Sequence, residues 1–309
     1  MRGERGFALV ITLVVTALLV ALLVEFVNEV YVDASHSHNF VASQQAGMLA
    51  ESGIAGGIKL LQVSSALRMG EQYSSLLEPW AKPQTFDSGA GSVTISIEEE
   101  SGKLNLNTAT STNGTANDYT QMAVRLLTRM KLSTELTDAL MDWVDENDTP
   151  LPGGAETSYY GTLKLPYAAK NNRLETVDEL ALLKGFTPAI LTKLRPCVTV
   201  YGSSDFELAT RININTADRD VIAALDEKLS DDLVERILDY RKTRPITNLN
   251  SIPGLDVLAA NLSLKVGYIG NVYRIHAEGR VGESVSRAEA VVRTAGGTTP
   301  PVVLYWREY

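Results

Sequence analysis

Cysteine and histidine are scarce in this chain of 309 residues, which has one cysteine, Cys197, and three histidines. A single cysteine excludes an intramolecular disulfide, a Cys-x-x-Cys redox pair and a cysteine-rich zinc site. Cys197 precedes the apolar run Val198-Thr-Val200, which predicts a buried strand residue rather than a nucleophile. His36 and His38 lie two apart in a predicted helix, so they point to different faces and do not suggest a metal site.

The sequence also lacks a basic excess and the common catalytic motifs. It has 28 Lys and Arg against 37 Asp and Glu, a net charge of −9, which disfavours nucleic acid as a partner. No Walker A, Gly-x-Ser-x-Gly, His-Glu-x-x-His or Gly-x-Gly-x-x-Gly string is present. Paired acids could mimic a glycosidase or phosphatase site, but they fall in a Pro/Gly loop without a basic phosphate clamp. We therefore expect a protein that is not an enzyme.

Charge is absent from one segment, Phe7 to Val24, which directly follows a short charged leader. As a helix this segment is about 27 Å long, close to the thickness of a hydrocarbon core. Arg2 and Arg5 precede it and Glu25 follows it, so the positive-inside rule predicts a cytoplasmic N-terminus and an external body. The sequence predicts a single membrane-spanning helix over residues 7–26.

Three kinds of N-terminal segment fit this pattern: a cleaved signal peptide, an uncleaved signal anchor and a prepilin signal. The apolar run is longer than a typical signal-peptide core of about 7–15 residues, and no clear small-residue cleavage site follows it. Gly6-Phe7, between charged leader and apolar helix, resembles the class III signal of type IV pilins and type II secretion pseudopilins. That resemblance implies that a prepilin peptidase cuts after Gly6 and methylates Phe7.

The fifth residue after Gly6 is Ile11, whereas most pilins carry Glu there. Among pseudopilins, the missing Glu resembles the K-type minor pseudopilins of type II secretion. The resemblance implies a subunit at a filament tip, because this subunit offers no carboxylate to the N-terminal ammonium of a neighbour.

Strand patterns on both sides of a helical middle predict an α+β fold. The N-terminal helix is expected to continue to about Leu61 with a stripe through Val41, Gln45, Met48 or Leu49, Ser52 and Ala55. Small residues along it favour close packing on the chain's own sheet, and packing on sister subunits is compatible with this. Residues 64–91 are expected to form a loop. Strands are predicted over residues 92–98, 273–280, 284–293 and 302–309.

The helical middle contains an internal repeat: Lys103-Leu-Asn-Leu-Asn-Thr-Ala109 matches Arg211-Ile-Asn-Ile-Asn-Thr-Ala217. Each copy places Asn-Thr before a helix, where side-chain oxygens can cap backbone N–H groups. We expect two similar all-α units, resembling SAM-like or helix-hairpin-helix domains, inserted into a pilin-like core. The predicted segments are a leader (1–6), a membrane helix (7–26), a first core part (27–102), two helical domains (103–205 and 206–268) and a second core part (269–309).

The second copy also resembles tandem helix-hairpin-helix modules of DNA-binding competence proteins. In such modules, glycine-rich hairpins present backbone N–H groups to phosphate. Here the first hairpin position, residues 225–232, carries four acids and no glycine. Because an acidic loop repels phosphate, the resemblance extends to the fold and we expect no nucleic-acid binding.

A loop rich in acids follows the first helical stripe, from Asp142 to Glu156. Asp142 and Asp145 lie three apart at a helix end, and Gly153-Gly154 can turn the chain back. Oxygen ligands on a flexible loop favour calcium, although Pro150 stands where an EF-hand has glycine. The alternative is a solvated acidic loop. The string also resembles the calcium-binding stretch of K-type pseudopilins, and the candidate ligands are Asp142, Asp145, Asn147, Asp148 and Glu156.

Taken together, the leader, the repeats and the acidic loop resemble the K-type minor pseudopilins over nearly the whole chain. The resemblance implies a bacterial inner-membrane protein that enters a pseudopilus tip with minor pseudopilins I and J, and also H, and supports export of folded proteins across the outer membrane. A tip minor pilin of a type IV pilus is a close alternative. A membrane-anchored helix-hairpin-helix DNA-binding protein is a more distant one.

Overall fold

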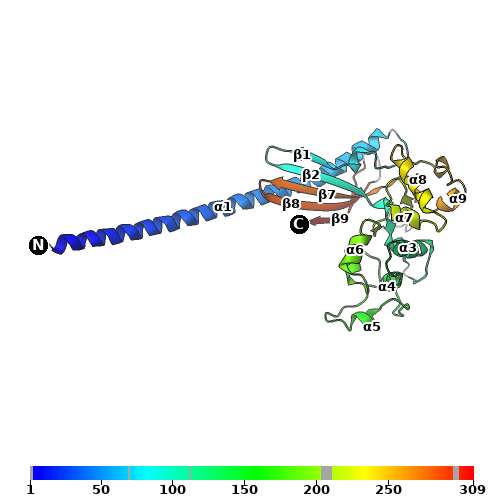
Figure 1. Ribbon diagram of the computed structural model, residues 1–309, viewed down its shortest axis with the longest axis horizontal. Helices are drawn as coiled ribbons and strands as arrows, with labels where there is room; N and C mark the ends of the chain where they lie inside the picture. Colours follow the sequence, from blue (N-terminus) through cyan, green and yellow to red (C-terminus); the bar gives the residue numbers. More distant parts are fainter. Residues whose placement is uncertain (1–2, 69, 111–112, 203–210, 295–298) are drawn as a thin grey trace.

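One long N-terminal helix and a body made of a sheet and helical segments form the molecule (Figure 1). The computed structural model describes residues 3–68, 70–110, 113–202, 211–294 and 299–309. The helix α1 (Gly3–Leu67) leaves the body as a rod, and the N-terminus lies at its far end (Figure 1). The α+β class and the long N-terminal helix that the sequence predicts are confirmed.

The two halves of α1 have different surroundings. The N-terminal half is apolar and exposed, and Phe7–Leu67 contains a stretch long and apolar enough to cross a membrane. The C-terminal half packs on the sheet through small residues. Gly53 is buried there. A Cβ atom at this position would lie 2.7 Å from the side chains of Ala277 and Val93, so only glycine allows the helix to approach the sheet this closely. Gly279 on the sheet allows the same close approach, since its Cβ would lie 2.1 Å from the Ala46 carbonyl oxygen.

The predicted stripe on α1 is wrong about which face is buried. Val41, Gln45, Met48, Ser52 and Ala55 are all exposed, whereas Leu49, the alternative to Met48, is half-buried against the core. The buried face runs one position later. It consists of Ala42, Ala46, Ala50, Gly53, Ile54, Gly57 and Leu61.

The sheet has five antiparallel strands in the order β1-β2-β7-β8-β9. Its α1-facing side carries the row Ile97, Ile275, Ala290 and Trp306, one residue from each of four strands. The strands are β1 (Gln84–Asp87), β2 (Ser92–Glu99), β7 (Val272–Val281), β8 (Ser284–Arg293) and β9 (Val302–Glu308).

Residues 64–91 are more ordered than the predicted loop. Helix α1 continues to Leu67, a 3-10 turn η1 (Pro79–Ala81) follows, and β1 pairs with β2. Trp80 of η1 is buried and meets the Tyr273 ring edge-on at 5.3 Å. The aromatic contact fixes this segment against the sheet.

Between β2 and β7 the chain forms two helical units, which we call the first unit (104–199) and the second unit (212–267). The turn η2 (Glu100–Gly102) joins β2 to the first unit. The first unit contains β3 (Leu104–Asn105), α2 (Leu106–Ala109), α3 (Asp118–Arg129), α4 (Glu135–Val144), α5 (Thr157–Tyr160), η3 (Val177–Leu182), α6 (Pro188–Leu194) and β4 (Val198–Thr199).

The second unit has the same kind of closure by two short parallel strands. In the first unit β3 pairs with β4, and in the second β5 pairs with β6. One hydrophobic cluster extends through both units, so they share a core. The second unit contains β5 (Ile212–Asn213), α7 (Arg219–Ala224), α8 (Asp231–Arg241), η4 (Leu249–Ser251), α9 (Ala259–Leu262) and β6 (Val266–Gly267).

The sequence repeat has a shared structural role. The Asn107 amide donates to the carbonyl oxygens of Leu174 and Val200, and its Oδ1 accepts from the Leu174 N–H. Asn215, its counterpart, bonds in the same way to Ile246 and to the Tyr268 carbonyl. Each asparagine thus ties the start of its unit to two later segments. The predicted boundary between the units, at residues 205 and 206, lies outside the described residues.

A buried carboxyl group joins the sheet to the second unit. Glu99, at the end of β2, is 6% exposed, and Asn213 Nδ2 lies 3.0 and 2.9 Å from its two carboxylate oxygens. Burial raises the pKa of Glu99 to about 8. The hydrogen bond from Asn213 and the charge of Arg68 lower this pKa, whereas the charge of Glu78 raises it further. At neutral pH this group therefore stays largely protonated.

The replacement Glu99→Gln should stabilise the chain at pH 8. The folded state holds the Glu99 proton more tightly than the unfolded chain does, so the contribution of this group to stability is fully present below about pH 4.5 and is lost as the pH rises to about 8. The glutamine removes the part of the slope that Glu99 causes, a gain of about 4 kcal/mol at pH 8. Unfolding of the full chain in detergent between pH 5 and 8 measures it. The neighbouring Glu98→Gln keeps the slope, and equal slopes in wild type and Glu99→Gln contradict the assignment.

Candidate metal centre

Two aspartates of the predicted site lie at the C-terminal end of α4. Asp142 is in the last turn of this helix and Asp145 is its C-cap, with extended backbone angles that end the helix. Carboxylates are unfavourable at a helix C-terminus, where the backbone carbonyls already concentrate negative charge. A cation placed beside these groups would therefore stabilise the end of the helix.

The loop after α4 brings a third carboxylate to the same point. Glu156 is the N-cap of α5, and its carboxyl group meets those of Asp142 and Asp145. One oxygen from each residue lies within 4.8 Å of the others. All three residues are buried, at 0, 2 and 1% exposure for Asp142, Asp145 and Glu156.

Hydrogen bonds satisfy two of the three carboxyl groups. Both oxygens of Asp142 accept from the Leu151 N–H, at 3.2 and 3.1 Å. Asp145 Oδ1 accepts from the Asn147 backbone N–H and from Asn147 Nδ2, at 3.1 and 2.8 Å. Both oxygens of Glu156 are buried without a hydrogen-bond partner. A buried carboxyl group left in this way needs either a proton or a cation.

The cluster is electrostatically strained. Burial raises the pKa of Glu156 to about 7, with further upward contributions from Asp142, Asp145 and Asp148. Burial also raises the pKa of Asp142 and of Asp145, and the nearby acids add to both shifts. Each carboxylate thus opposes ionisation of the others.

Close backbone packing around Asp142 explains the glycine pair in the loop. A Cβ atom at Gly154 would lie 1.9 Å from Asp142 Oδ2, so a larger residue has no room there. The Gly153 N–H donates to Asp138 Oδ2 at 3.0 Å, and Lys184 Nζ donates to the Gly154 carbonyl at 2.9 Å. Sequence reasoning missed both Asp138 and Lys184, because Lys184 is distant in the chain and Asp138 lies one helical turn earlier.

The two other candidate ligands lie outside this buried group. Asn147 is exposed, its Nδ2 is turned to Asp145, and its Oδ1 accepts from the Thr149 N–H at 2.7 Å. Asp148 is exposed as well. The structure thus brings together Asp142, Asp145 and Glu156, with Asn147 at the rim and Asp148 further out.

The donor set is made of oxygen atoms, which suits a hard cation. Ligand atoms of one calcium ion lie about 2.3–2.6 Å from it, so they lie no more than about 5 Å from one another. The three carboxylate oxygens meet this condition. The unpartnered oxygens of Glu156 supply the vacant acceptors that such an ion requires.

The second predicted site, the cleavage point, lies at the start of α1. Gly6 and Phe7 are within the first turns of the helix, and Phe7 is 70% exposed. Ile11 lies one turn further on and is also exposed.

Two family models match this chain. Both carry the description type II secretion system protein K, one over residues 102–203 and the other over residues 212–265. The chain is also 30% identical to a type II secretion system protein K of Pseudomonas aeruginosa, over 86% of this chain and 82% of that protein. A protein of the same name from Aeromonas hydrophila is 26% identical over 94% of this chain and 93% of its own length.

A solved structure has the same fold. It is a chain in the crystal structure of the GspK-GspI-GspJ complex from the type 2 secretion system of enterotoxigenic Escherichia coli. The TM-score is 0.70 at 19% identity, and the match covers 89% of this chain and 99% of that one. The two chains therefore share an α+β fold over most of their length.

Proposed function

This chain belongs to the type II secretion system protein K family of minor pseudopilins, and we propose that it caps the pseudopilus tip and supports export of folded proteins across the outer membrane. The observation that carries this proposal is the placement of the helical units: the second unit lies at the end of the body far from the N-terminus of α1, and the first unit lies beside that end of the sheet (Figure 1). A subunit stacked above would meet these units. The shape therefore suits an end position.

The apolar half of α1 serves in turn as an anchor and as an assembly helix in this proposal. Residues 7–26 hold the chain in the inner membrane, with the N-terminus in the cytoplasm and the body outside. A prepilin peptidase removes residues 1–6 after Gly6 and methylates Phe7. In the assembled tip the exposed apolar side chains of α1 pack against the helices of neighbours.

The proposed neighbours are minor pseudopilins I and J, with H as a further subunit. Support comes from the fold shared with a chain of the E. coli complex that contains GspI and GspJ. We propose that the chain catalyses no reaction itself, as befits a structural pseudopilin.

Co-purification from detergent-solubilised membranes tests the assembly role. The tagged full chain should retain the I and J pseudopilins of its own secretion system in stoichiometric amounts. A type IV pilin from the same cells provides the specificity control. Retention of that pilin in place of I and J contradicts the proposal.

We also propose that Asp142, Asp145 and Glu156 bind calcium. The orphaned carboxyl group of Glu156 and the convergence of three buried acids support this assignment. Asn147 and Asp148 lie close enough in the chain to complete the coordination through side-chain or water oxygens. Bound calcium neutralises the cluster and fixes the loop between α4 and α5 against the first unit.

The two helical units are proposed to be SAM-like repeats. Their support is the matched closure by parallel strand pairs and the equivalent hydrogen bonds of Asn107 and Asn215. The acids around residues 225–232 give no phosphate site, and the units serve as protein modules.

A further inference from the structure

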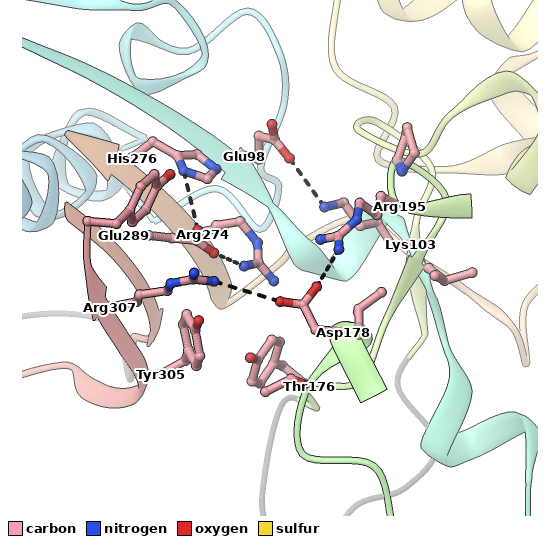
Figure 2. A pocket seen from close by; sticks show the side chains of 15 residues that line it. Glu98, Lys103, Thr176, Asp178, Arg195, Arg274, His276, Glu289, Tyr305 and Arg307 are labelled. Atoms are coloured by element: carbon pink, nitrogen blue, oxygen red, sulfur yellow. Dashed lines mark hydrogen bonds and ion pairs between the residues drawn. The ribbon is translucent and has the colours of Figure 1, made fainter. Parts of the chain in front are cut away.

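A pocket of about 490 Å³ lies between the sheet and the first unit, on the face of the sheet opposite α1 (Figure 2). Strands β2, β7, β8 and β9 form one wall, and the segments around η3 and α6 form the other. Its residues come from segments far apart in the sequence, so no local motif indicates it.

The inner part of the pocket holds two cations among three carboxylates. Lys103 Nζ lies 3.2 Å from Glu98 and 2.9 Å from Glu100. Arg274 Nε lies 2.8 Å from Glu100, and Arg274 also pairs with Glu289. The side chains of Lys103 and Arg274 are only 11 and 17% exposed, so these ion pairs form a largely buried floor, in which Glu100 Oε2 has no hydrogen-bond partner.

The mouth of the pocket has an excess of cationic groups. Arg195 of the first unit pairs with Asp178, and Arg307 Nη1 of β9 lies 4.0 Å from the same carboxyl group (Figure 2). Two guanidinium groups thus share one carboxylate, and about half of each of these side chains is exposed. A guanidinium has five N–H donors, so most donors of these two arginines have no carboxylate partner. They can donate to a further carboxylate group.

Strand β9 lies at the edge of the sheet, next to this mouth. Within the described residues, its inner side pairs with β8 and no strand pairs with its outer side. Tyr305 and Arg307 point to the pocket, whereas Trp306 lies in the row that faces α1 and is 42% exposed. The strand offers free backbone groups, a cation on one face and an aromatic ring on the other.

We propose that β9 is the docking strand for an extended acidic segment of a partner protein. The segment adds to the free edge, its acidic side chain lies between Arg307 and Arg195, and the apolar residues beside it cover Trp306. Cross-strand neighbours lie about 4.5–5.5 Å apart, within reach of an Arg–carboxylate pair. A second copy of this chain is a poor match, because its own β9 presents Tyr305 and Arg307 on the pocket side, while its one acid, Glu308, lies with Trp306 on the other side.

Site-specific photocrosslinking in the source bacterium tests this surface. A benzoylphenylalanine in place of Tyr305 should give an adduct whose partner peptide, identified by mass spectrometry, alternates acidic with apolar residues. The control places the same group at Phe86 on β1, the opposite edge strand, where the side chain is 53% exposed. This position should not label that segment.

Replacing the two arginines tests whether their charge binds the acidic segment. The double variant Arg195→Gln/Arg307→Gln should lower the adduct yield about ten-fold, the loss expected for charge-assisted bonds. The charge-reversed pair Arg195→Glu/Arg307→Glu should restore labelling when the partner's acid is replaced by Arg. Unchanged yield in the glutamine variant overturns the proposal, as does an adduct with a second copy of this chain or no adduct.

The proposal of a docking strand rests on the proposed pseudopilus role in one respect: the crosslinking is done in cells in which that role would operate. Secretion by the strain with the Tyr305 replacement is measured in parallel. Normal secretion without the adduct contradicts the docking strand alone. Secretion that never depends on this chain contradicts the pseudopilus role.

Discussion

Calcium at about one hundred times its dissociation constant will raise the melting temperature of the full chain in detergent by roughly 5–10 °C. Binding at that excess stabilises the folded state by about 2.7 kcal/mol, and each kcal/mol shifts the transition by about 2–4 °C for a chain of this size. The reason is the unpartnered Glu156 carboxyl group beside Asp142 and Asp145, which an ion both satisfies and neutralises. EDTA should reverse the shift.

The variant Glu156→Gln separates ion binding from a general charge effect. It should lose the response to calcium and should raise the melting temperature without calcium, because one buried acid is removed from the cluster. Glu146→Gln is the matched control, since Glu146 is an exposed acid of the same loop. Its calcium response should equal that of the wild type. A solvated acidic loop instead predicts no response in any of the three proteins.

A bulky residue at Gly6 will keep the leader on the chain and abolish its function. In Gly6→Leu the peptidase cannot cut, so residues 1–6 keep charged groups next to the apolar helix. Moving such a helix from the bilayer into a filament then requires burial of Arg5 and Glu4, which is costly. Intact-mass measurement of the purified chain should show the unprocessed, unmethylated N-terminus, and secretion should fall to the level of a deletion strain.

The leader itself supplies the control for this experiment. Gly3→Leu makes the same chemical change three residues earlier and should leave cleavage and methylation of Phe7 intact. A wild-type chain whose mature N-terminus begins after Val24 would mean an ordinary signal peptide. That result contradicts the prepilin assignment.

The fold could be predicted from sequence wherever the spacing of apolar residues along the chain indicates one type of secondary structure. Strands β2 and β7 alternate between buried and more exposed residues, β9 begins with a continuous apolar run, and α1 runs for 65 residues without proline. Strand β1 was missed because Gln84–Asp87 is mostly exposed and is held by backbone pairing with β2 rather than by an apolar face. The buried face of α1 was misassigned because alanine and glycine pack on the sheet, whereas Val41 and Met48 remain exposed.

The candidate metal centre shows the same division between local and distant effects. Asp142 and Asp145 were predictable from their spacing at a helix end, and Gly153-Gly154 indicated a turn. The return path of the loop, set by hydrogen bonds to Asp138 and Asp142, decides that Glu156 is buried while Asp148 is not. The pocket beside β9 left no sequence signal, because its walls come from four strands and the first unit.

Deletion of the gene in the source bacterium, with measurement of both secretion and twitching motility, tests the central assignment most directly. The account predicts that export of folded proteins to the medium is lost, that the wild-type gene restores it, and that twitching is unchanged. Unimpaired export together with lost twitching would instead place the chain in a type IV pilus and contradict the type II secretion role.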